Sequence, residues 1–128
     1  MSFSNYLETE ILDHVFGGNA YTAPTTMYLA LYTVAPSDTG GGTEVSTVST
    51  GYVRQEVAFT VSGNTASNTA AIEYATATAN YGTVVAVGVL DAETSGNLMA
   101  YASLSASKAI ETGDVFRVPA GDLDITLD

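Results

Sequence analysis

The chain begins with apolar residues at helical spacing and then changes to short runs of alternating apolar and polar residues. The helical stripe consists of Leu7, Ile11, Leu12, Val15 and Phe16. Residues three and four apart share one face of an α-helix, so the stripe predicts an amphipathic helix over about residues 4–16. Ser4 or Asn5 can cap its start, and Gly17-Gly18 can end it. A helix of about three turns is marginal alone, so we expect it either to plug one end of its own sandwich or to dock on a neighbouring molecule.

From about residue 26 onward the pattern is typical of short strands. Residues 26–34 carry apolar side chains on both faces, and residues 52–61 alternate as a half-buried strand does. Residues 81–91 form the most continuous apolar run and are predicted to be central in a sheet. The shorter predicted strands lie around Ile72 and Tyr74, at 98–104, 108–110 and 115–118, and at the C-terminus. About seven or eight strands without intervening helices predict an all-β fold, an antiparallel jelly-roll-like β-sandwich, as one domain over residues 1–128.

Three segments rich in Gly, Ser, Thr or Asn are predicted to be loops or turns. Residues 35–51 read as a long loop and residues 62–69 as a turn. The segment between the strands at 81–91 and 98–104 is predicted to close a hairpin, with Gly96-Asn97 allowing positive backbone φ. In that hairpin Asp91 and Glu93 are interpreted as solvated turn residues.

The charge balance narrows the kinds of partner. The net charge is −11, and Arg54, Lys108 and Arg117 are the only basic side chains apart from the one histidine. Three cations cannot build the basic surface that nucleic acids require, and an anionic membrane would repel this chain. We therefore expect protein partners, with no nucleic acid and no membrane. The absence of cysteine removes disulfides and thiolate metal sites.

Candidate catalytic and metal-binding groups are few. A Ser-His-Asp triad would need His14, the single histidine, and no G-x-S-x-G motif is present. Paired carboxylates of the glycosidase type would be Asp91 with Glu93, Glu111 with Asp114, or Asp122 with Asp124, but each pair lies at a predicted turn. The loop after Asp91 lacks the EF-hand ligand spacing, which leaves only a calcium site of another kind open. We predict no catalytic residue, no cofactor and no metal, and hence no enzyme.

Tyrosines, the helix stripe and the long loop supply candidate contact residues. Tyrosine offers a large contact area at low entropic cost, which suits protein surfaces. Filling the rims of a small core is the alternative role for the same side chains. The candidate interface residues are Tyr6, Leu7, Ile11, Val15, Tyr28, Tyr32, Thr43, Val45 and Tyr101.

Three passages resemble a family of short virion proteins of tailed bacteriophages. They are SFSNYLETEILDHVFGG with YTAPTTMYLALYTVAPSDTGGGTEV, then NYGTVVAVGVLDAETSGNLMAYASL, then SKAIETGDVFRVPAGDLDITLD. Together they cover most of the chain. Many members of the family carry Trp where this chain has Tyr81 before Gly82, and the family's usual Gly-Gly-Asn loop is here Ser95-Gly96-Asn97.

The resemblance implies a non-enzymatic structural protein of the virion, labelled in its relatives as a tail or tail-fibre-like protein or as a capsid decoration (cement) protein. Because the chain is short and has no fibre repeat, we expect a cement protein on the outer capsid surface, made in the host cytoplasm. Its partner would be the major capsid protein, and it would form a homo-dimer or homo-trimer. The alternative is a tail or adaptor protein of the same virion. A β-sandwich that binds host glycans is a remoter alternative.

Overall fold

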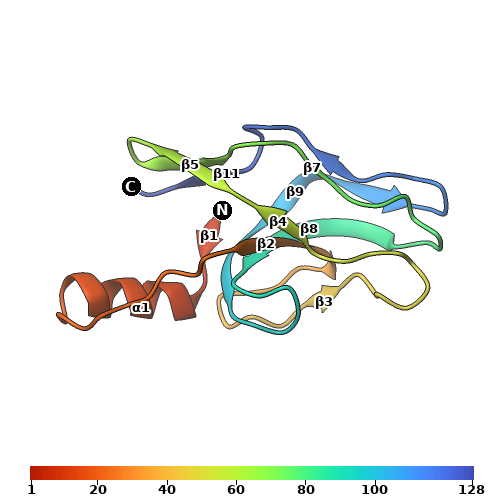
Figure 1. Ribbon diagram of the computed structural model, residues 1–128. Helices are drawn as coiled ribbons and strands as arrows, with labels where there is room; N and C mark the ends of the chain where they lie inside the picture. Colours follow the sequence, from red (N-terminus) through yellow and green to blue (C-terminus); the bar gives the residue numbers. More distant parts are fainter.

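The computed structural model describes all of residues 1–128 (Figure 1). It contains one helix, α1 (Asn5–Val15), and eleven short strands. The strands are β1 (Ser2–Phe3), β2 (Met27–Val34), β3 (Thr43–Glu44), β4 (Gln55–Val57), β5 (Phe59–Ser62), β6 (Thr65–Asn68), β7 (Ile72–Glu73), β8 (Gly82–Leu90), β9 (Leu98–Ile110), β10 (Arg117–Val118) and β11 (Asp124–Thr126).

The largest sheet has six strands, all paired antiparallel. Its order is β1-β9-β8-β2-β3, and β4 also pairs with β2 beside β3. The predicted central strand is therefore central: β8 lies between β9 and β2, with Leu29 opposite Val89 and Val89 opposite Ala100. β4 pairs with β2 from Met27 to Leu29, and β3 pairs with it from Tyr32 onward. Two short strands therefore pair along the same edge of β2.

Two smaller sheets face the largest one. One has three strands in the order β11-β6-β5, and the other pairs β10 with β7. In Figure 1 these strands form the upper layer and β2, β8 and β9 the lower one. The predicted all-β antiparallel sandwich is thus confirmed. The arrangement differs from an eight-stranded jelly roll of two sheets because its strands divide six, three and two among three sheets.

The core lies between these layers, and a second cluster covers the outer face of the large sheet. Alternation along β2 points Leu29 and Leu31 into a cluster of 15 buried residues between the layers. Ala30 and Tyr32 point the other way, into a cluster of five buried residues that includes Leu98. This explains why β2 carries apolar side chains on both faces.

Two buried tyrosines brace β2, Tyr74 from the segment after β7 and Tyr52 from the segment between β3 and β4. Tyr74 Oη donates to the Leu29 carbonyl (2.6 Å), and Tyr52 Oη accepts from the Leu31 N–H (3.0 Å). The Leu31 N–H lies where β4 has ended and β3 has not yet begun, so the hydroxyl replaces a missing strand partner. The two rings stack at a centroid distance of 5.8 Å.

Several predicted boundaries are corrected by long-range pairing. The predicted turn at 62–69 contains β6, since its Thr and Ser residues pair with β5 and β11. The predicted loop at 35–51 contains β3, and the N-terminus adds β1, each only two residues long. The predicted strand at 52–61 is divided into β4 and β5, which belong to different sheets.

β9 is one strand where two were predicted, at 98–104 and 108–110. Val84 pairs with Lys108 and Ala86 with Ser103, so two steps along β8 correspond to five along β9. Three extra residues (five minus two) are therefore absorbed in an irregularity of β9. That bulge interrupts the alternation of side chains, which is why the sequence pattern appears as two strands.

The helix predicted over about residues 4–16 is observed as α1, but it does not pack along the sandwich. It has no buried residue, and Figure 1 shows it projecting away from the sheets. We call residues 4–26, which comprise α1 and the segment that returns to β2, the arm. Packing of the helix on its own sandwich is therefore limited to the base of the arm, and docking on a neighbouring molecule stays a prediction.

Candidate functional site

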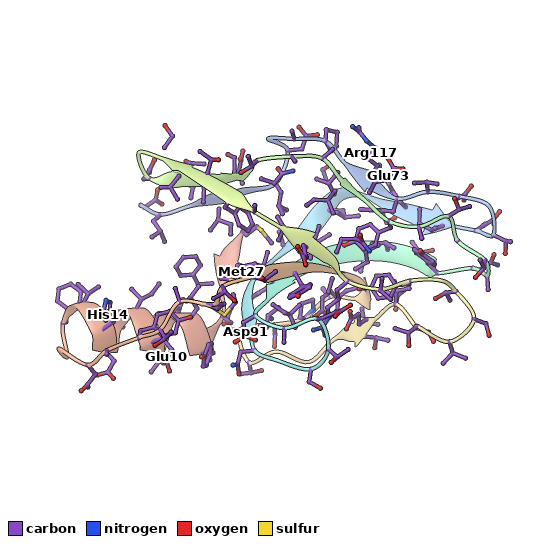
Figure 2. All side chains as sticks on the ribbon, in the orientation of Figure 1. Glu10, His14, Met27, Glu73, Asp91 and Arg117 are labelled. Atoms are coloured by element: carbon purple, nitrogen blue, oxygen red, sulfur yellow. The ribbon has the colours of Figure 1, made fainter.

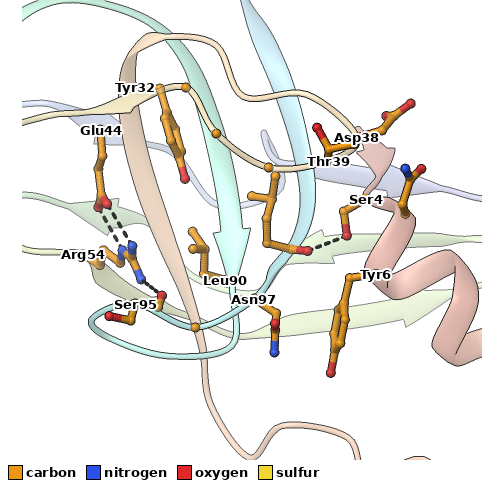
Figure 3. Close-up of a pocket in the computed structure, with 16 residues that line it drawn as sticks. Ser4, Tyr6, Tyr32, Asp38, Thr39, Glu44, Arg54, Leu90, Ser95 and Asn97 are labelled. Atoms are coloured by element: carbon orange, nitrogen blue, oxygen red, sulfur yellow. Dashed lines mark hydrogen bonds and ion pairs between the residues drawn. The ribbon is translucent and has the colours of Figure 1, made fainter.

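A hollow lies on the surface where the base of the arm meets the outer face of the large sheet. Its volume is about 600 Å³, and Figure 3 shows it between the start of α1, the Gly40–Gly42 loop and the β8–β9 hairpin. The lining is mostly polar, with the side chains of Asp38, Glu44, Arg54 and Asn97 around the ring of Tyr32. We call this hollow the cleft.

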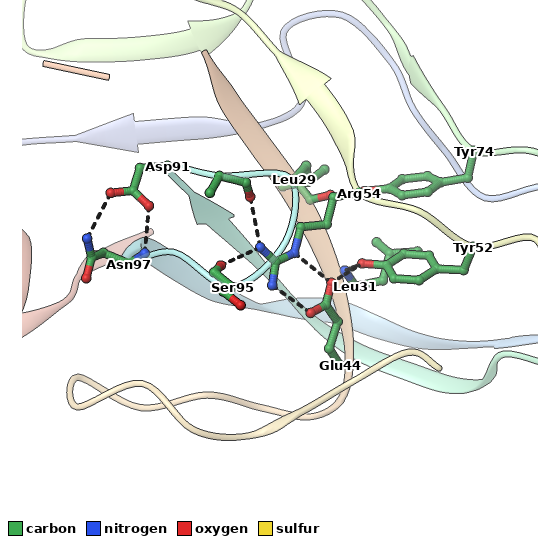
Figure 4. Close-up of polar contacts among 10 residues, drawn as sticks. Leu29, Leu31, Glu44, Tyr52, Arg54, Tyr74, Asp91, Ser95 and Asn97 are labelled. Carbon is green, nitrogen blue, oxygen red and sulfur yellow. Dashed lines mark hydrogen bonds and ion pairs between the residues drawn. The ribbon is translucent and has the colours of Figure 1, made fainter. Parts of the chain in front are cut away.

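An arginine brace forms one wall of the cleft and closes the β8–β9 hairpin against β3 (Figure 4). Arg54 makes a bidentate pair with Glu44, with Nε and Nη2 donating at 2.9 and 2.8 Å. Its Nη1 donates to the carbonyl oxygens of Ala92 (2.8 Å) and Ser95 (2.7 Å). Four of its five N–H donors are thus used, so Arg54 holds three segments together and is not free for a ligand.

Glu44 is the centre of the same network. Burial favours its neutral form, but hydrogen bonds from Arg54 and from Tyr52 Oη (2.7 Å) favour the carboxylate more strongly. The pKa of Glu44 therefore lies below its usual value. The negative charge on this cleft wall is balanced within the chain by Arg54.

The hairpin turn is built differently from the prediction. Asp91 accepts hydrogen bonds from the backbone N–H of Asn97 (2.6 Å) and from its side-chain amide (3.0 Å), so it closes the turn and is only partly exposed. Positive φ occurs at Ser95 (55°) and Gly96 (79°) and not at Asn97. Glu93 is exposed, as the solvated-turn interpretation expects.

Two other carboxylates of the weighed pairs make structural hydrogen bonds, Asp114 within its turn and Asp124 of β11 across to β6. Asp114 Oδ2 accepts from the backbone N–H of Glu111 (2.9 Å), and Asp124 accepts from the Ser67 hydroxyl. His14 lies on the arm, away from the cleft, with Nδ1 2.9 Å from the Asn19 carbonyl oxygen (Figure 2). The cleft therefore combines carboxylates, amides, the Arg54 guanidinium and two tyrosine rings, with no imidazole base beside them.

The base of the arm is fastened to the cleft rim by backbone hydrogen bonds. The Ser4 N–H donates to the Met99 carbonyl (2.9 Å), and the Asn5 N–H donates to the Asp38 carbonyl (2.9 Å). Ser4 Oγ caps α1 by accepting from the Leu7 N–H (3.2 Å) and donates to the Leu98 carbonyl. Tyr101 Oη donates to Asp38 and holds the loop that carries it.

The structure divides the candidate interface residues into three groups. Tyr32 and Val45 are buried in the two clusters, so they are part of the core and are not offered to a partner. Tyr6, Leu7, Ile11, Tyr28 and Tyr101 are half-buried, and Thr43 and Val15 are exposed.

The most exposed apolar residue of the arm was not among those candidates. Phe16 is 82% exposed, and Leu12 is also exposed. Both belong to the helix stripe. Phe16 directly precedes Gly17-Gly18, where the helix ends, and that position is the sequence signal for its exposure. Hydrophobic periodicity identifies the apolar face of a helix and does not show whether another element covers it.

The fold and the site together define a small antiparallel β-sandwich with a projecting helical arm and a polar cleft at the base of that arm. No helix is long and apolar enough to cross a membrane.

The comparisons with known proteins agree with this class. Residues 2–126 match the model of a family described as podophage GP4 fiber I protein gp80. The match extends over nearly the whole chain, so the protein belongs to this family. No curated protein matches the sequence. The resemblance to structural proteins of the tailed-phage virion is thus confirmed, and the fibre description fits the tail alternative better than the capsid prediction.

Proposed function

We propose that this protein is a structural component of the tail-fibre apparatus of a phage virion and acts by assembly without catalysing a reaction. The observation that carries the proposal is the match of residues 2–126 to a fibre protein family. A match of that extent relates the sandwich, the cleft and the arm together to the family. A capsid cement role is favoured only by the small size of the chain and its lack of a fibre repeat, and neither feature is specific to capsids.

The geometry supports an assembly role. The bidentate Arg54–Glu44 pair holds the hairpin against β3, and the hydroxyls of Tyr52 and Tyr74 bond to the backbone of β2. These polar groups have their hydrogen-bond partners within the chain. A rigid domain with a fixed projection suits a repeated position in a particle, because little ordering entropy is lost on docking. The partners under this proposal are tail proteins of the same virion.

The placement is tested by immunogold labelling of intact virions with antibodies raised against the purified chain. Gold particles at the tail would support the proposal. Gold particles distributed over the head would contradict it and support capsid decoration. Virions grown without this protein provide the control for antibody specificity.

Two further properties are tested on the purified chain. We expect no release of reducing sugar from host surface polysaccharide, and release above that of a boiled sample would contradict the non-catalytic role. The expected homo-dimer or homo-trimer is tested by light scattering coupled to size exclusion, where a mass of 13.2 kDa would indicate a monomer.

A further inference from the structure

The distal end of the arm carries three large apolar side chains that the rest of the chain leaves uncovered. Leu12, Val15 and Phe16 are 58%, 61% and 82% exposed. Their spacing of three and four residues places them on one side of α1. Single exposed hydrophobic residues are common on protein surfaces, whereas a group of them on a projecting element is typical of an interaction site. We call these three residues the arm tip.

The arm tip is held in place by the segment that follows the helix. The Gly17 N–H donates to the Leu12 carbonyl (3.2 Å), and the Asn19 N–H donates to the Asp13 carbonyl (3.2 Å). The Asn19 side-chain amide also donates to the Asp13 carboxylate (2.8 Å). The return segment is thereby fixed against the last turn of α1. A tip that is already ordered loses little conformational entropy when it binds.

The charges around the arm tip indicate what kind of surface can receive it. Glu8, Glu10 and Asp13 lie on the same helix, and residues 1–53 contain no lysine or arginine. A receiving pocket should therefore be apolar at its centre and basic at its rim, because like charges across an interface are unfavourable.

A second copy of this chain is a poor source of such a rim. Arg54 is engaged in the brace and its side chain is only 9% exposed. Arg117 pairs with Glu73, and Lys108 lies over the ring of Phe116 at 5.7 Å. Only Arg54 is thus committed within its own copy, which leaves two exposed cations on a copy that carries a net charge of −11. Charge complementarity therefore favours a different polypeptide.

We propose that the arm tip is a docking plug that inserts into an apolar pocket rimmed by lysine or arginine on a different protein of the particle. Phe16 is the central contact, flanked by Leu12 and Val15, and the acidic side chains of α1 face the basic rim. This inference goes beyond the placement proposed above, since it concerns which surface binds and what chemistry receives it.

The first test is rebinding of the full chain to particles that lack it, obtained from a phage with a stop codon in its gene. Phe16→Ser is compared with Val61→Ser, which removes a similarly exposed apolar side chain (72%) from β5, outside the arm. Phe16→Ser should raise the half-saturating concentration at least about 10-fold, as for a central interface residue. Val61→Ser should leave it within about 2-fold. Equal effects of the two variants would overturn the proposal.

Folding of both variants is checked by circular dichroism and urea unfolding, and no change is expected because both side chains are in solvent. Raising NaCl from about 0.1 to 0.5 M should weaken rebinding of the unaltered chain, because exposed charge pairs are screened. A half-saturating concentration that does not change with NaCl would contradict the proposed basic rim.

The second test identifies the occupant in assembled virions through a photoreactive benzophenone side chain at position 16. The expected product joins this chain to a different virion protein, at a segment that contains lysine or arginine. A product that joins two copies of this chain, or the absence of any product, would overturn the proposal. The same side chain at position 61 provides the control. Because labelling of head or tail is measured separately, failure of this proposal is distinguishable from failure of the proposed placement.

Discussion

Removing the arginine brace should be among the most destabilising changes outside the apolar core. In Arg54→Ala the chain loses both donors to Glu44 and the two hydrogen bonds to the carbonyls of Ala92 and Ser95. The hairpin carbonyls can be rehydrated, since they lie near the surface. The Glu44 carboxylate is less easily rehydrated, because it is half-buried and retains only the hydrogen bond from Tyr52.

The size of the effect follows from this burial. Removing one partner of a fully buried ion pair costs about 3–5 kcal/mol. The Glu44 side chain is 27% exposed and that of Arg54 is 9% exposed, so water recovers part of that cost. We therefore expect a loss of about 2–3 kcal/mol in the free energy of unfolding. With a urea m-value of about 1.5 kcal/mol/M, the midpoint should fall by roughly 1.3–2 M.

Urea unfolding followed by far-ultraviolet circular dichroism measures this shift. The matched control is Arg117→Ala, which removes the exposed pair with Glu73, whose atoms are 3.6 Å apart (Figure 2). Exposed pairs contribute about 0–1 kcal/mol, so the control midpoint should move by less than about 0.7 M. If Arg54→Ala and Arg117→Ala shift the midpoint equally, the reasoning about the brace is refuted.

Three further changes test other parts of the fold. Tyr74→Phe should cost about 0.5–1.5 kcal/mol in urea unfolding, because it removes the hydrogen bond that the Tyr74 hydroxyl donates to the buried Leu29 carbonyl, and an unchanged free energy of unfolding would contradict that role. Gly88→Ala should cost about 1–3 kcal/mol, because its Cβ would lie 2.9 Å from atoms of Leu98 and Tyr32; an unchanged melting temperature would show that the site has room. Glu44 has a pKa below its usual value of 4.5, so its contribution is present above that pH and is lost as the pH falls through its folded pKa. The stability difference between the unaltered chain and Glu44→Gln should therefore shrink as urea unfolding is repeated from pH 7 to pH 3, and a constant difference would contradict the pairing.

Local patterns in the sequence were enough to predict the fold class. Alternation along β2 and the apolar run of β8 reflect strands buried on both faces, and such runs are short-range information. The N-terminal helix also follows from spacing and from the cap at Ser4. The helix starts at Asn5, directly after the Ser4 cap, and ends at Val15, shortly before Gly17-Gly18.

Features that depend on distant partners were not predictable in this way. β6 is a strand because Thr65 to Asn68 pair with two other segments, although their own composition is that of a turn. The bulge in β9 is visible only in the register against β8. Burial of Val45 likewise follows from its hydrogen bond to the Leu31 carbonyl across the sheet.

The candidate site shows the same division. The sequence placed Leu7, Ile11 and Val15 on one helix face, but it could not show that the sandwich leaves the end of that face uncovered. Arg54 was counted only as a charge, because its four hydrogen bonds join segments separated by up to 41 positions. Such a brace has no local sequence signal.

The most direct test of the account is an asymmetric cryo-electron microscopy reconstruction of the virion tail at a resolution that shows strands. We predict density at the tail-fibre attachment region into which the six-stranded sheet and the projecting α1 arm fit as one body. Matching density on the capsid lattice, with none at the tail, would contradict the account.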